Sequence, residues 1–181
     1  SFALGGKGLI NLSSDSSKII REEPSSKSSP AIGASYNYDS RRNGYNPDAG
    51  IKFKLRQEYV GFGTANKYLK TDASVGGKME VFNGDLTLMA ELEAGRLLTL
   101  SGNSGILDRY FASGAIRGFE YNGLGPRDRS ALNNDALGGN LFAATRFEAN
   151  FPVRLLEGFG MSGGAFYDVG TVWGLDSTAG S

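Results

Sequence analysis

The chain has 181 residues, and its 19 Lys and Arg balance its 19 Asp and Glu, so the formal net charge is zero. This balance argues against nucleic acid as a partner, because binding to phosphates needs an excess of basic residues. The absence of His and Cys removes the commonest general base, the commonest metal ligand and any disulfide framework. The usual residues of acid–base catalysis, of zinc binding and of thiol chemistry are therefore missing.

Alternation of apolar and polar residues is the strongest pattern along the chain. In 66–79, for example, Leu69, Val75 and Met79 share one face, and Lys70 and Asp72 share the other. The pattern predicts seven strands, at 2–14, 31–39, 50–61, 66–81, 85–100, 138–152 and 160–173. Most exceed the 5–6 residues typical of soluble sheets and reach the 9–11 residues that cross a bilayer at a tilt. Charges of both signs on the polar faces suit a wet lumen, so we expect an all-β antiparallel transmembrane β-barrel.

The predicted connections alternate in length. Those at 41–49, 81–85 and 152–159 are short to moderate, whereas 15–30 is long and Ser-rich and 101–137 is longer still. Short turns on the periplasmic side and long loops outside are typical of outer-membrane barrels. Aromatic residues near the strand ends are expected to form the interfacial girdles: Tyr36, Tyr38, Tyr59, Phe62, Phe82, Phe151 and Trp173.

Three short motifs have simpler explanations than chemistry. Residues 158–163 match G-x-G-x-x-G, but a dinucleotide site needs a helix afterwards, and here a strand is expected. Asn11-Leu12-Ser13 matches a glycosylation sequon, which carries no weight in a bacterium. Glu91 and Glu93 share one strand face, where a solvated lumen wall explains them better than an acid/base pair.

The long loop carries a more specific set of residues: Ile116, Arg117, Gly118 and Phe119, then Gly125 and Pro126. The following strands add three further elements, which are Gly138-Gly139-Asn140, Glu148 with Phe151-Pro152, and Phe166, Asp168, Gly170, Val172 and Trp173. This ordered set resembles the BamA family of barrel-assembly factors. Asp39-Ser40-Arg41 with Pro47 and Gly50 resembles a periplasmic turn of that family.

The resemblance implies a loop that folds back into the lumen, where Arg117 pairs with Glu148 and Asp168. Gly118 is expected to let the backbone pass close to the wall. The implied function is the folding and insertion of β-barrel proteins in the outer membrane of a Gram-negative bacterium, without catalysis. The implied partners are outer-membrane lipids, unfolded outer-membrane proteins and accessory lipoproteins.

Seven strands are fewer than the even counts, from eight upward, of bacterial barrels. We therefore expect residues 1–181 to be part of a barrel of roughly sixteen strands, with the terminal strands, their lateral gate and the periplasmic POTRA domains outside this sequence. The alternatives within the superfamily are a TamA-like factor and a two-partner secretion transporter. A passive porin and a soluble β-sandwich binding module are the alternatives outside it.

Overall fold

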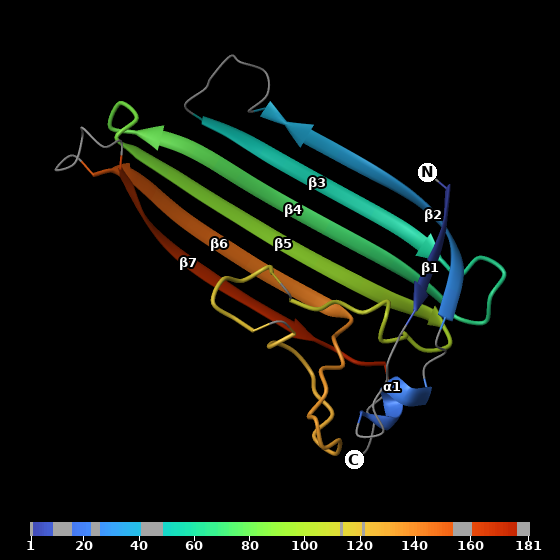
Figure 1. Cartoon of the computed structure of the whole chain (residues 1–181). Helices are drawn as coiled ribbons and strands as arrows, with labels where there is room; N and C mark the ends of the chain where they lie inside the picture. Colours follow the sequence, from blue (N-terminus) through green and yellow to red (C-terminus); the bar gives the residue numbers. More distant parts are fainter. Residues whose placement is uncertain are drawn as a thin grey trace.

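The computed structural model describes residues 2–8, 16–22, 26–40, 49–112, 114–120, 122–153 and 161–176. In these ranges seven strands form one antiparallel sheet in chain order, with β1 and β7 at its edges (Figure 1). The strands are β1 (Phe2–Gly8), β2 (Ser26–Asp39), β3 (Ala49–Val60), β4 (Lys67–Val81), β5 (Leu86–Ser101), β6 (Leu141–Pro152) and β7 (Ser162–Trp173). A short helix, α1 (Lys18–Glu22), lies between β1 and β2. No helix in the described ranges is long and apolar enough to cross a membrane.

The all-β antiparallel fold is confirmed, but two strand boundaries were predicted wrongly. Residues 26–30, expected within a loop, belong to β2, because pairing with β1 satisfies the backbone of this Ser-rich segment. Residues 138–140, expected to open a strand, precede β6, and Gly138 has a φ of 65°. Of the remaining predictions, residues 9–15, 41–48 and 154–160 lie outside the described residues. With them go the sequon, most of the Pro47 turn and the first half of the G-x-G-x-x-G match.

One face of the sheet exposes large apolar side chains from every strand between β2 and β7. They all follow the alternation predicted for the membrane side: Ile32, Tyr36, Tyr38, Ile51, Leu55, Val75, Met79, Leu88, Leu92, Leu98, Leu100, Phe147, Phe151, Tyr167, Val169 and Trp173. Such a continuous apolar surface is far larger than a soluble monomer presents to water. It is the outward face of a membrane barrel.

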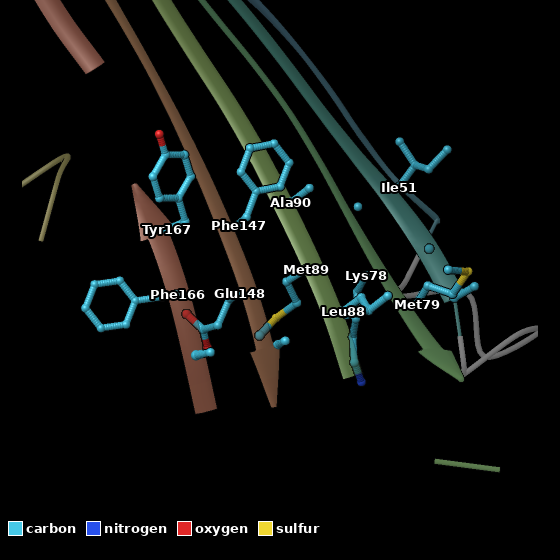
Figure 2. A pocket seen from close by; sticks show the side chains of 15 residues that line it. Ile51, Lys78, Met79, Leu88, Met89, Ala90, Phe147, Glu148, Phe166 and Tyr167 are labelled. Carbon is cyan, nitrogen blue, oxygen red and sulfur yellow. The ribbon is translucent and has the colours of Figure 1, made fainter. Parts of the chain in front are cut away.

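An apolar hollow of about 700 Å³ lies near one end of β3 to β7, and Figure 2 shows the side chains that line it. Most of the side chains around it, such as Ile51, Met79, Phe147 and Tyr167, belong to the outer face. Glu148 and Phe166 also border it, but they alternate with these residues along β6 and β7 and so lie on the opposite face. The hollow is therefore part of the membrane-facing surface.

The opposite face is buried where the connection between β5 and β6 covers it. Val60, Tyr68 and Leu97 form the buried apolar cluster, against which Ala31 and Tyr110 also pack. In Figure 1 this connection, coloured yellow to orange, lies over β6 and β7. The described core thus lies on the inner wall, beneath the long connection.

Candidate functional site: the loop on the inner wall

The connection that contains the candidate motif spans residues 102–140, between the end of β5 and the start of β6. Near its start it contacts the wall at β4. The hydroxyl of Tyr68 donates a hydrogen bond of 2.8 Å to the Asp108 carboxylate, and Lys70 Nζ donates one of 3.2 Å to the Asp108 carbonyl. Both donors lie on the inner face of β4, so the loop begins by turning inward.

Tyr110 fixes the next part of the loop. Its hydroxyl donates a 2.6 Å hydrogen bond to the Asp72 carboxylate, and its ring stacks on Phe142 with 6.1 Å between centroids. The ring covers Gly95, where a Cβ atom would lie 2.6 Å from the ring carbons. Burial, and then the hydrogen bond to Asp72, raise the pKa of Tyr110, so its hydroxyl stays a donor at physiological pH.

Ile116 packs into a notch that Gly170 leaves in β7. The Ile116 side chain is only 3% exposed. A Cβ atom on Gly170 would lie 2.3 Å from the Ile116 Cδ1 atom and 2.9 Å from the Ala143 carbonyl oxygen. The absence of a side chain at Gly170 therefore makes the space that the Ile116 side chain fills.

Arg117 binds the Asp168 carboxylate in a bidentate arrangement. Its Nε donates to Oδ2 at 2.8 Å and its Nη2 donates to Oδ1 at 2.8 Å. The Arg117 backbone N–H also donates to Oδ2, at 3.0 Å. The Asp168 side chain is 2% exposed, against 40% for Arg117. The carboxylate on β7 is therefore shielded from solvent, whereas the guanidinium that binds it stays partly exposed.

A second carboxylate completes the arginine site. Arg117 Nη1 donates a 2.7 Å hydrogen bond to Glu148 Oε2, and the guanidinium carbon lies 4.0 Å from the centre of the Phe166 ring. Asn150 Nδ2 donates to the other Glu148 oxygen at 2.9 Å. Asp168, and then Glu148, raise the pKa of Arg117 above its ordinary value. The loop is thus tied to both β6 and β7 by one charged side chain.

The reason expected for Gly118 is wrong. A Cβ atom at this position would meet nothing within 4 Å, so no close approach to the wall requires glycine. Instead its φ is 83°, a left-handed conformation that glycine adopts at little cost. Gly118 therefore turns the chain after Arg117, and Phe119, the last residue of the motif, is 56% exposed.

Arg146 is a wall residue that the sequence did not single out. Its Nη1 donates a 2.9 Å hydrogen bond to the Ala115 carbonyl, next to the motif. Its Nη2 lies 2.7 Å from Glu93 and 3.2 Å from Glu91, and Glu91 also pairs with Lys52 at 3.0 Å. Alternation does place Arg146 on the inner face, but only the path of the loop reveals its contact with the Ala115 backbone.

The other residues predicted to support the site lie mainly in the second half of the loop, which leads back to β6. A Cβ atom on Gly125 would lie 3.1 Å from Val172, and the Pro126 carbonyl accepts a 2.9 Å hydrogen bond from Leu137 N–H. Gly139 and Tyr110 exchange backbone hydrogen bonds of 2.8 and 3.0 Å. Gly138 lies beside the Tyr110 carbonyl, and the Asn140 side chain donates a hydrogen bond to Asp176. Trp173 is not brought to the site, because it alternates onto the outer face.

The loop also contacts the helix α1 region. Ser17 is fully buried; its backbone N–H donates to Asp135 at 2.6 Å and its hydroxyl donates to Asp128 at 2.5 Å. Hydrogen bonds from Ser130, and then from Ser17, lower the pKa of Asp128. The connection 102–140 is therefore fixed both on the wall and on the neighbouring connection.

An antiparallel meander with an apolar outer face, and with a long loop held against its charged inner face, defines a transmembrane β-barrel protein. The match to protein families is more specific: residues 10–181 match the model of the Omp85 superfamily domain. The chain belongs to the Omp85 superfamily, and its location is the outer membrane of a Gram-negative bacterium.

Two relatives confirm the resemblance to BamA that the motifs indicated. The chain is 29% identical over 178 residues to the outer membrane protein assembly factor BamA of Neorickettsia risticii (strain Illinois), covering 98% of this chain and 24% of that protein. It also resembles the crystal structure of BamA from Haemophilus ducreyi lacking POTRA domains 1–3, with a TM-score of 0.63 and 21% identity over 82% of this chain and 30% of that one. The chain thus spans about a quarter of the curated relative.

Proposed function

We propose that this protein is an outer-membrane assembly factor that folds β-barrel proteins and inserts them into the outer membrane. The observation that carries the proposal is the attachment of the loop to the wall, where Arg117 binds Asp168 and Glu148. The named function of the BamA relative supports it. Under this proposal the substrates are unfolded outer-membrane proteins, with membrane lipids and accessory lipoproteins as further partners.

No bond is made or broken in the proposed activity, and no cofactor takes part. The free energy comes from the folding of the substrate, and the barrel lowers the barrier to insertion. Arg117 joins the loop to β6 through Glu148 and to β7 through Asp168. The role proposed for these three residues is to keep the inner wall and the loop in the conformation that supports insertion. Substrate reception, POTRA domains and the lateral gate are assigned to parts of the protein outside these 181 residues.

The test replaces Arg117 in the full-length natural protein, in cells depleted of the wild-type copy. We expect Arg117→Ala to reduce folded outer-membrane porins, measured by their altered gel mobility on heating, at an unchanged amount of the variant itself. Arg117→Lys keeps the charge but loses the two-pronged contact with Asp168, so an intermediate loss is expected. Arg129→Ala is the matched control, because Arg129 is an exposed arginine of the same loop.

The outcomes separate the alternative functions. Normal porin assembly by a folded Arg117→Ala variant would contradict the proposed role of the loop. If porin assembly is intact but a secreted passenger protein is lost, a translocator of the same superfamily is the better explanation. Steady ion conductance that is indifferent to Arg117 would favour a passive porin.

A further inference from the structure

Arg96 is a charged residue on the membrane-facing side of the sheet. On β5 it alternates in step with Leu92, Ala94 and Leu98, and its side chain is exposed like theirs. Its neighbours in sequence, Gly95 and Leu97, are buried on the inner side. Arg96 therefore points outward, toward lipid.

On the β4 side Arg96 has polar neighbours, unlike most of this face. Arg96 pairs across the sheet with Thr71, and Thr71 pairs with Gln57. Side chains in such rows have Cβ atoms about 5 Å apart. Gln57 Nε2 donates a 3.3 Å hydrogen bond to Thr71 Oγ1, which leaves the Thr71 hydroxyl proton to donate elsewhere. In the described ranges no carboxylate pairs with the Arg96 guanidinium.

The position of the row along the strands fixes its depth in the membrane. On its other side Arg96 pairs with Leu141 of β6, and Leu141 pairs with Trp173 of β7. Trp173 is the only Trp of the chain. Exposed Trp marks the membrane–water interface of a barrel. The nearby end of the sheet carries the 102–140 connection, and long loops lie outside the cell. Arg96 therefore lies near the headgroups of the outer leaflet.

A guanidinium at this depth needs an acceptor. Arg is charged at every physiological pH and offers a planar fork of donors that matches the oxygens of a phosphate. The carboxylates of the inner face lie across the sheet from Arg96, so an anionic acceptor has to come from the membrane side. Lipid phosphates are the anionic groups present at headgroup level.

We propose that Arg96 and Thr71, with Thr71 oriented by Gln57, bind the phosphate of an anionic lipid in the outer leaflet. The lipid chains would then lie along the apolar residues of β5 that continue into the membrane, Ala94 and Leu92. This inference does not depend on the assembly function, because it rests only on the membrane-facing surface.

The test places a fluorophore beside the site, in the full-length protein reconstituted in vesicles of phosphatidylcholine. Leu141→Cys, the outward-facing partner of Arg96 on β6, carries the label; the described chain offers no cysteine of its own. The vesicles contain a minor fraction of phosphatidylglycerol or of phosphatidylcholine, each with a nitroxide at the same acyl carbon. We expect phosphatidylglycerol to associate about tenfold more strongly and so to quench at lower concentration, because the choline cation of phosphatidylcholine competes with Arg96 for the same phosphate.

Two variants and a second label decide the outcome. Arg96→Leu should abolish the preference for phosphatidylglycerol, and Thr71→Val should weaken it several-fold. A label at Phe147→Cys, on the same face of β6 but six residues further along the strand from Leu141, should show no preference. Equal quenching by the two lipids in the wild-type protein, or a preference that survives Arg96→Leu, overturns the proposal. A preference that survives Thr71→Val unchanged overturns the two-residue site and leaves a lone interfacial arginine.

Discussion

Replacing Gly170 with alanine tests how tightly the loop fits the wall. The new Cβ atom would lie 2.3 Å from the Ile116 Cδ1 atom, 2.9 Å from the Ala143 carbonyl oxygen and 3.1 Å from the Ala144 Cβ atom. Real Cβ atoms essentially never approach other atoms below 3.0 Å. Ile116 has little room to move, because it is 3% exposed. The clash must therefore push the loop away from β7 or distort the strand.

The expected cost is about 1–3 kcal/mol, the usual range for overpacking a filled site. Shortening Ile116 to alanine costs about 2–5 kcal/mol on its own, because it empties a packed site. In the double variant the shorter side chain leaves space for the new methyl group. The two costs should therefore not add, and the Gly170→Ala cost should shrink by at least half in the Ile116→Ala background.

The assay is denaturant unfolding of the full-length protein in lipid, read by the gel mobility of the folded barrel, for the wild type and all three variants. Gly76→Ala is the matched control, because a Cβ atom on this inner-face glycine of β4 would come no closer than 3.5 Å to any atom. Two results would refute the close fit of Ile116 against Gly170. One is a loss of unfolding free energy in Gly170→Ala no larger than that in Gly76→Ala. The other is a Gly170→Ala loss that is unchanged in the Ile116→Ala background.

Three further variants probe other contacts of the loop. Tyr68→Phe removes the donor to Asp108, which is 3% exposed, and should cost about 1–3 kcal/mol in the same unfolding assay. Arg146→Gln unpairs two wall carboxylates and a loop carbonyl; it should increase protease cleavage within the loop while the barrel remains folded. The lowered pKa of Asp128 means that its contribution to stability is complete above the ordinary carboxyl pKa, about 4, and is lost as the pH falls through the lowered value. The unfolding midpoint should therefore drop more between pH of about 6 and about 3 in the wild type than in Asp128→Asn.

The alternation of side chains was enough to predict the sheet and its two faces. Successive side chains of a strand point to opposite faces of the sheet, so Leu69 and Lys70 could be assigned to opposite faces without a structure. The pairing of Arg117 with acids on the next strands came from the resemblance, and the structure contains those contacts. Residues 26–30 escaped prediction because they become a strand through pairing with β1 rather than through their own composition.

The loop contacts of Arg146, Tyr110 and Ser17 could not be predicted for a different reason. Each involves a backbone group or a short side chain in an irregular segment, such as the Ala115 carbonyl that accepts from Arg146. Alternation says nothing about the path of a connection between strands. The residue types were visible in the sequence, but their partners were set by how 102–140 crosses the wall.

The central claim is that this loop lies on the inner wall, held there by Arg117. The most direct measurement is a disulfide between Ile116→Cys and Gly170→Cys in the full-length protein in native membranes. A Cβ atom at position 170 would lie 2.3 Å from the Ile116 Cδ1 atom. Ile116→Cys removes that atom, which leaves space for the two sulfur atoms to meet at bonding distance. We predict that mild oxidation links the pair in the folded barrel and that adding Arg117→Ala sharply reduces the link. A folded barrel that never forms this disulfide, or forms it equally without Arg117, would contradict the account.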